Sequence, residues 1–222
     1  MQARPILTVD IALFTIVDWA LRLALLKRSH GPFEGRAALI GGYIHPDQDR
    51  DATAAAHRIL KEKAGLTGVF IEQLMTFSGS GRDPRGWSVS IAYFALVPSE
   101  RLAGSPAAHG LSLVPVERLP SLPFDHTAIL SAALERLRGK SAYSTLPAFL
   151  LPELFTFPEL KSTYETVMGT PLNDSAFRRK ISELGIIEEV ADAKSPATAL
   201  RRRPAQMYRL KQRSLIAFDS TV

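Results

Sequence analysis

Residues 41–46 read Gly-Gly-Tyr-Ile-His-Pro, and an acidic turn separates them from a helical pattern that runs from Asp51 to Leu66. The glycine pair follows the apolar run 37–40, as in a strand that turns sharply into a loop where a residue without Cβ is needed. The helical pattern ends at Gly65, a residue type that is common at helix C-caps. Its apolar positions, at helical spacing, are Ala52, Ala55, Ala56, Ile59 and Leu60. The sequence therefore predicts a strand, a glycine loop and a helix in direct succession.

This stretch resembles the Nudix box, the signature of the Nudix hydrolase family. The box reads Gly, five residues, Glu, seven residues, and then Arg-Glu-aliphatic-x-Glu-Glu-x-Gly-aliphatic. When the box is aligned backwards from Gly65 and Leu66, its second half falls on residues 58–66, which read Arg-Ile-Leu-Lys-Glu-Lys-Ala-Gly-Leu. The positions that fit the pattern are Arg58, Leu60, Glu62, Gly65 and Leu66.

The metal-binding positions of the box do not fit. Three glutamates at i, i+3 and i+4 lie on one helix face and together hold divalent cations against a diphosphate. Here those positions are Ile59, Glu62 and Lys63. A single carboxylate cannot hold a cluster of hydrated magnesium ions, and Lys63 places an ammonium group near the metal position. We therefore predict that the fold is kept and the hydrolase is lost, with no catalytic residue, no metal site and no required cofactor.

The loop before the helix also departs from the pattern. Its glutamate position falls on Gln48 counted forwards and on Arg50 counted backwards. Asp47, Asp49 and Asp51 are candidate substitutes, but a loop of aspartates is more often a solvated turn. The second interpretation is the simpler one.

Composition sets broad limits. A chain of 222 residues is long enough for one large or two small domains. The absence of cysteine excludes disulfides, a thiolate zinc site and a cysteine nucleophile, and it suits a reducing cytosol. The apolar run 11–16 is too short to span a bilayer and is flanked by Asp10 and Asp18, so we expect a cytoplasmic protein without a signal peptide or membrane contact. The net charge of +5 is compatible with nucleic-acid binding but does not establish it.

The order of the predicted elements indicates an α/β fold. Extended segments are expected at residues 7–15, 21–27, 69–77 and 88–97. A later helix at 127–138, capped by Asp125 or Thr127, is expected to close at Gly139. Strands, a helix, more strands and a further helix suit an α/β/α sandwich with a mixed sheet, here Nudix-like. Residues 1–140 would form this domain and residues 141–222 a second one.

A basic loop at residues 82–87 reads Arg-Asp-Pro-Arg-Gly-Trp. With Glu-Gln-Leu at 72–74, it resembles a segment of ADP-ribose-type Nudix proteins and, more closely, of Nudix-related transcriptional regulators. Arginines offer forked donors for phosphate, and a tryptophan offers an aromatic face for a base. The alternative is a hairpin with solvated arginines and a tryptophan packed on the core. The resemblance favours ligand contact and implies the effector-binding residues Arg28, Arg36, Glu62, Arg82, Asp83, Arg85 and Trp87.

The C-terminal third has the pattern of a helix-turn-helix. One helix begins at Thr156, a capping residue followed by an early proline, and stops at Gly169. A second helix begins after a short turn, with Asp174 or Ser175 as its N-cap and with cations at 178–180. The alternative is a solvated helix in a small all-α domain.

The segment that follows favours DNA binding. Two extended runs, 185–190 and 205–210, flank the basic tip 201–203, and residues 194–213 contain seven Lys or Arg and no acidic residue. A hairpin with an arginine-rich tip directly after a helix-turn-helix is typical of a wing, whose cations suit phosphates or a minor groove. The predicted DNA-binding residues are Ser175, Arg178, Arg179, Lys180, Arg201, Arg202 and Arg203.

Taken together, residues 7–210 resemble the NrtR family of Nudix-related regulators of NAD biosynthesis. The C-terminal match includes Ser-Ala-Phe-Arg-Arg at 175–179 and Arg-Pro-Ala-Gln-Met-Tyr at 203–208. The resemblance implies a homodimeric repressor that binds a palindromic operator in double-stranded DNA and is released by an NAD-related nucleotide, typically ADP-ribose. Three alternatives remain: an active Nudix pyrophosphatase acting on ADP-ribose or a dinucleotide, a Nudix-type regulator that senses a sugar, and an RNA-binding Nudix-like module.

Overall fold

The computed structural model describes residues 4–194, 205–219 and 221–222. The chain divides into two compact units, Met1–Arg136 and Leu137–Val222. The boundary falls within helix α3 (His126–Ser141), and the boundary expected from the sequence lies a few residues further along the same helix.

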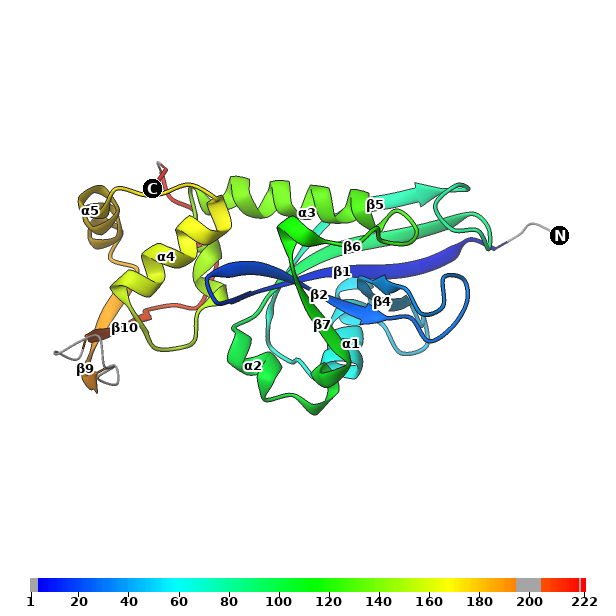
Figure 1. Ribbon diagram of the computed structural model, residues 1–222, viewed down its shortest axis with the longest axis horizontal. Helices are drawn as coiled ribbons and strands as arrows, with labels where there is room; N and C mark the ends of the chain where they lie inside the picture. Colours follow the sequence, from blue (N-terminus) through cyan, green and yellow to red (C-terminus); the bar gives the residue numbers. More distant parts are fainter. Residues whose placement is uncertain (1–3, 195–204, 220) are drawn as a thin grey trace. The chain divides into compact units, whose positions relative to one another are not determined.

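The described part of the first unit contains a seven-stranded mixed sheet (Figure 1). Its strands are β1 (Ile6–Val17), β2 (Ala20–Lys27), β3 (Ala37–Ala38), β4 (Ile40–Tyr43), β5 (Phe70–Gly79), β6 (Ser88–Leu96) and β7 (Leu111–Pro115). The order β3-β2-β1-β6-β5 places β1 at the centre, where it runs parallel to β6 and antiparallel to β2. The first half of β1 pairs instead with β4, so that Asp10 lies opposite Gly41. The four extended segments predicted from the sequence are confirmed as β1, β2, β5 and β6.

Two helices lie on opposite sides of this sheet, α1 (Ala52–Ala64) and the first part of α3 (Figure 1). Alternate residues of β1, namely Val9, Ile11 and Leu13, share one buried cluster with Ile59 and Leu60 of α1. This alternation follows from the two-residue period of a strand, which sends the intervening side chains to the α3 side. The predicted α/β/α sandwich is confirmed. A short helix α2 (Ser99–Ala103) and two 3-10 helices (Pro106–Gly110, Val116–Arg118) complete the described unit.

The ends of α1 follow from local chemistry. Asp51 is the N-cap, and its side chain accepts a hydrogen bond from the Ala54 N–H at 2.7 Å. Gly65 is the C-cap with a φ of 65°, a left-handed conformation that favours glycine. The predicted stop of α3 at Gly139 is wrong, because the helix continues to Ser141.

The second unit contains a helix pair and a small sheet. Its elements are a 3-10 helix (Leu146–Leu150), β8 (Phe155–Thr156), α4 (Phe157–Met168), α5 (Asp174–Leu184), β9 (Ile187–Lys194) and β10 (Gln206–Leu210). The three strands pair in the order β8-β10-β9. Two helices followed by a hairpin that pairs back to the start of the first helix form a winged helix, as the sequence predicts.

Caps fix both helices of this unit. Thr156 and Glu159 form a capping box at α4, in which each residue's side chain accepts a hydrogen bond from the other's backbone N–H. The N-cap of α5 is Asn173, whose Oδ1 accepts from the Ala176 N–H at 3.0 Å. The expectation of Asp174 or Ser175 at this position is therefore wrong by one or two residues.

Candidate functional site

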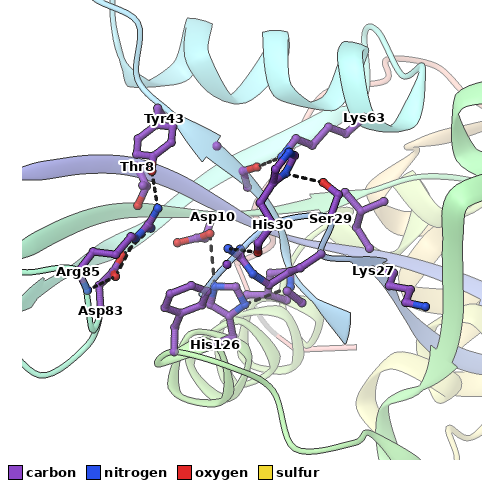
Figure 2. Close-up of a pocket in the computed structure, with 18 of the residues that line it drawn as sticks. Thr8, Asp10, Lys27, Ser29, His30, Tyr43, Lys63, Asp83, Arg85 and His126 are labelled. Carbon is purple, nitrogen blue, oxygen red and sulfur yellow. Dashed lines mark hydrogen bonds and ion pairs between the residues drawn. The ribbon is translucent and has the colours of Figure 1, made fainter. Parts of the chain in front are cut away.

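A cavity of about 470 Å³ opens in the first unit (Figure 2). Its lining comes from β1, the end of β2 with the following loop, β3 and β4, α1, the basic loop 82–85 and the start of α3. Lys63 and His126 approach it from the α1 and α3 sides (Figure 2). Tyr43, Asp83 and Arg85 gather at one end of this view.

A buried carboxylate, Asp10 on β1, lies in the wall of the cavity. Ser90 Oγ donates to its Oδ2 at 2.6 Å, His126 Nε2 lies 3.4 Å from its Oδ1, and Arg82 Nη2 lies 3.6 Å from its Oδ2. Burial raises the pKa of Asp10, but its interactions with His126, Ser90 and Arg82 outweigh burial, so the pKa lies below the ordinary value. The wall therefore carries an ionised, fully engaged carboxylate.

Arg82 is an anchor of the basic loop. Its Nε and Nη2 each donate to one oxygen of Asp125 at 2.8 Å, and its Nη1 donates to Ser88 Oγ at 3.1 Å. Only 8% of its side chain is exposed. Because this bidentate pair occupies the guanidinium fork, Arg82 orients the loop in the described structure.

Arg85 and Tyr43 form one end of the cavity (Figure 2). Arg85 Nε and Nη2 donate to Asp83 at 3.0 and 2.7 Å, and Nη1 donates to the Tyr43 hydroxyl. Burial raises the pKa of Asp83, but the hydrogen bonds from Arg85 outweigh it and the pKa is lowered. With 34% of its side chain exposed beside a half-exposed tyrosine ring, Arg85 can offer charge to a ligand next to an aromatic face.

The loop after β2 supplies another part of the lining. Arg28 Nε donates to the Pro32 carbonyl at 2.8 Å, and its guanidinium carbon lies 4.8 Å from the centre of the Phe124 ring. His30 Nδ1 and Ser29 Oγ are 2.7 Å apart. These contacts place a cation and an aromatic ring together on a second wall.

Helix α1, which carries the second half of the box, contributes one described side chain to the cavity lining. This is Lys63, whose Nζ donates to the Gly41 carbonyl. Ile59 is buried in the core, and Glu62 accepts from Arg58 Nη1 at 3.2 Å. The side chains at the three metal-binding positions are thus an aliphatic chain, an ion-paired carboxylate and an ammonium group. They do not fit the divalent cations that the Nudix resemblance implies. The described part of the chain holds no group of three His, Cys, Asp or Glu side chains able to bind a metal ion.

Asp49 is a buried part of the box, so the interpretation of its loop as a solvated turn is wrong at this position. Arg58 Nε and Nη2 donate to its two oxygens at 2.8 and 2.7 Å, and the His45 N–H donates at 2.8 Å. The hydrogen bonds from Arg58 lower the pKa of Asp49 to about 2. Asp49 therefore fixes the loop onto the helix.

Four of the seven predicted effector-binding residues line the cavity: Arg28, Arg82, Asp83 and Arg85. The other three, Arg36, Glu62 and Trp87, lie outside the set of described residues that line it. Arg36 Nη2 donates to the Ser121 carbonyl at 2.7 Å, and Trp87 is 50% exposed, which also differs from the alternative of a core-packed ring.

The sequence reasoning missed other lining residues, chiefly Asp10, Tyr43, Phe124 and His126. Tyr43 follows the glycine pair directly and was within reach of a sequence argument. The remaining three carry no local signal.

In the second unit, the N-terminal half of α5 presents Ser175, Arg178 and Arg179 to solvent. The guanidinium carbon of Arg178 lies 4.0 Å from the centre of the Phe157 ring. Arg179 is 77% exposed, with Nε 3.8 Å from a Glu183 oxygen. Lys180, on the same stretch, is partly buried. Exposed arginines at this end of the second helix can contact phosphates or base edges.

Three of the predicted DNA-binding residues, Arg201, Arg202 and Arg203, lie outside the described residues. Among the helices that the structure describes, none combines the length and apolar character required to cross a bilayer.

Comparison with known proteins identifies the winged helix and a relative that matches most of the chain. Residues 147–210 match the family model of the NrtR DNA-binding winged helix domain. The ADPR responsive transcriptional repressor NtrR of Acinetobacter baylyi is 38% identical over 209 residues, which cover 92% of this chain and 82% of that protein.

Solved structures agree with both halves. The crystal structure of Shewanella oneidensis NrtR complexed with a 27mer DNA matches with a TM-score of 0.85 and 34% identity, covering 97% of this chain and 99% of that chain. The NUDIX domain of the same protein complexed with ADP ribose matches with a TM-score of 0.51 and 33% identity, covering 61% of this chain and 90% of that chain. The chain has a winged helix and a Nudix-like sandwich, and it is 38% identical to a repressor relative over 92% of its own length. It therefore belongs to the NrtR family of Nudix-related transcriptional regulators.

Proposed function

We propose that this protein is an ADP-ribose-responsive transcriptional repressor. In this proposal residues 1–140 form the effector-sensing domain and residues 141–222 form the DNA-binding domain. The whole protein would act in the cytoplasm. The observation that carries the proposal is the cation-lined cavity beside an altered Nudix box, in a chain that also has a winged helix with exposed arginines.

The cavity suits a nucleoside diphosphate in size and chemistry. Arg28 and Arg85 offer guanidinium donors for a diphosphate, and Phe124 and Tyr43 offer rings for a base or ribose. The Nudix domain of Shewanella oneidensis NrtR was crystallised with ADP ribose, which supports this choice of effector. We assign Arg82 and Asp83 to positioning, since both side chains are buried: Arg82 is held by Asp125, and Asp83 holds the more exposed Arg85.

The winged helix would bind operator DNA. Four residues of α5 would serve phosphates or base edges, namely Ser175, Arg178, Arg179 and Lys180, and Arg201 to Arg203 would serve mainly phosphates. As the family resemblance implies, the active form would be a homodimer on a palindromic operator. The effector would favour a dimer geometry in which the two reading helices no longer lie one DNA turn apart, so operator affinity would fall.

We further propose that the protein is not a hydrolase, because Ile59 and Lys63 replace metal-binding carboxylates. An active pyrophosphatase is the alternative from another class, and magnesium-dependent release of AMP from ADP-ribose at ordinary enzyme rates would establish it. A sugar effector in place of a nucleotide, or a preference for single-stranded RNA over duplex DNA, would support the other two alternatives.

The decisive experiment measures binding of a labelled duplex from the gene's upstream region, with and without ADP-ribose. Tight binding that ADP-ribose abolishes supports the whole proposal. Tight binding that ignores ADP-ribose keeps the regulator and rejects the effector. No binding above a random duplex at low salt rejects the repressor.

A variant with Arg85→Ala separates the two sites. We expect it to retain operator binding and to need a much higher ADP-ribose concentration for release. The matched control is Arg50→Ala, since Arg50 is an exposed arginine outside the set of described residues that line the cavity.

A further inference from the structure

The ammonium group of Lys63 is held in the cavity by the glycine pair. Its Nζ donates to the Gly41 carbonyl, and an ideal Cβ on Gly42 would lie 4.0 Å from it. A Cβ on Gly41 would lie 2.2 Å from Asp10 Oδ1, closer than atoms can approach. A side chain at position 41 would therefore clash with Asp10, and glycine at position 42 places no side-chain atom next to the ammonium group.

The charge of Lys63 is not neutralised within the described part of the chain. No described carboxylate forms an ion pair with Lys63 or with Arg28, its neighbour in the lining. The two acidic residues that line the cavity are engaged elsewhere, since Asp10 faces Arg82 and His126 while Asp83 binds Arg85. The cavity therefore has an excess of positive charge centred on these two side chains.

Burial makes the charge of Lys63 costly. Burial lowers the pKa of Lys63, the charges of Arg28 and Arg58 act in the same direction, and Asp10 and Glu62 oppose them. A partly desolvated cation among other cations is stabilised when an anion binds beside it. A phosphate next to Lys63 would provide that anion.

In the Nudix hydrolases that the box resembles, glutamates on this helix hold divalent cations against a diphosphate. Here the side chains at those positions do not fit such cations, and the side chain that enters the cavity already carries a positive charge. We propose that the Lys63 ammonium takes the place of the divalent cations, so that the cavity binds the diphosphate of its nucleotide effector without a metal ion. This inference rests on the proposed function, because it takes the effector to be a nucleoside diphosphate such as ADP-ribose.

The first test uses the full-length protein without any substitution. ADP-ribose is titrated by isothermal calorimetry in a buffer with EDTA and in the same buffer with excess magnesium chloride. We expect the two dissociation constants to agree within about twofold, a difference well under 1.4 kcal/mol. An affinity at least tenfold lower in EDTA would overturn the inference but keep ADP-ribose as effector. Absence of binding in both buffers would overturn the inference together with the proposed effector.

Variants of α1 locate the charge. Lys63→Gln removes the ammonium group and is expected to weaken ADP-ribose binding at least about tenfold in both buffers, since a charged hydrogen bond is lost. Lys63→Arg keeps the charge and should bind within a few fold of the unchanged protein. Lys61→Gln is the matched control, because Lys61 is exposed on the same helix and should leave affinity unchanged.

Two results would overturn the role of Lys63: a Lys63→Gln variant that binds as tightly as the unchanged protein, or an equal loss in Lys61→Gln. Thermal unfolding checks that each variant folds. If Lys63→Gln does not fold, the comparison of EDTA with magnesium in the unchanged protein still decides the question.

Discussion

The Nδ1 atom of His126 accepts a hydrogen bond from the backbone N–H of Leu39 at 3.1 Å. A backbone N–H can only donate, so Nδ1 carries no proton and the neutral ring must hold its proton on Nε2. This Nε2 atom lies 3.4 Å from Asp10 Oδ1, so its proton faces the carboxylate. The ring therefore links the start of α3 to the strand segment before the glycine pair and to the buried carboxylate of β1.

Replacing this ring should weaken the first unit. His126→Phe leaves the buried Leu39 N–H without an acceptor, and we expect the free energy of unfolding to fall by about 1–3 kcal/mol. Urea denaturation measures it, and His57→Phe on the exposed face of α1 is the control. Equal midpoints for the two variants would contradict the linking role.

Acid should remove the contribution of Asp49. Its pKa is lowered from 3.8 to about 2 in the folded protein, so its ionised form stabilises the fold. This contribution is fully present above the ordinary value and is lost as pH falls through the folded value. Asp49→Asn should therefore be less stable than the unchanged protein at neutral pH, and the difference should shrink as pH falls from about 3.8 toward about 2.

Urea midpoints across that pH range measure the effect. Asp47→Asn, at an exposed position of the same loop, is the control and should show no such pH-dependent difference. A stability difference for Asp49→Asn that persists unchanged in acid would show that the ion pair with Arg58 is not its source.

The two arginines of the basic loop should differ in what they change. Arg82→Ala leaves Asp125 and Asp10 without their buried cation, and we expect a loss of about 3 kcal/mol in the free energy of unfolding. Arg85→Ala removes a more exposed cation, and it should lower ADP-ribose affinity at least about tenfold with a smaller loss of stability. Calorimetric titration and urea denaturation of both variants check the contrast, and the reverse pattern would exchange the two roles.

The two arginines of α5 should also separate. Arg179→Ala should weaken DNA binding and reduce the slope of log affinity against log salt by about one, because one phosphate contact is lost. Arg178→Ala should likewise weaken DNA binding, but it should in addition lower the free energy of unfolding by about 1 kcal/mol, since the guanidinium lies over the Phe157 ring. Fluorescence anisotropy over a salt series measures the slope, with Arg50→Ala as control.

The arginines at 201–203 can be tested in the same way without any structural assumption. A double variant, Arg202→Ala with Arg203→Ala, should weaken binding to every duplex and flatten the salt slope. An unchanged slope would reject their assignment to phosphates.

The sequence predicted the parts of the fold that depend on local chemistry. Gly65 and Gly169 end their helices in the left-handed conformation that favours glycine, and Thr156 starts α4. Gly139 failed as a stop because one glycine in a helix costs only about 1 kcal/mol, and α3 continues through it to Ser141. The cap of α5 was missed by one or two residues because Asn, Asp and Ser are all good capping residues, and only the structure shows that Asn173 takes this place.

The cavity was predictable only in part. The basic loop and the box indicated Arg85 and Lys63 as unusual side chains, because each stands within a recognisable pattern. The contact between His126 and Leu39 joins residues 87 apart in the sequence. No periodicity or spacing records such a contact, since it arises only when β1, β4 and α3 assemble.

The burial of Ile59 limits how the box could regain three carboxylates. Ile59 lies on the face of α1 that is buried against the strands, and a Cβ on Gly42 would lie 3.3 Å from its side chain. A glutamate at this position would bring an unpaired carboxylate toward an apolar core, at a cost of several kcal/mol. A glutamate at position 63 would remove the cation from the cavity. A return to three carboxylates therefore requires two substitutions, at positions 59 and 63, and the first of them would place a carboxylate against the core of the sandwich.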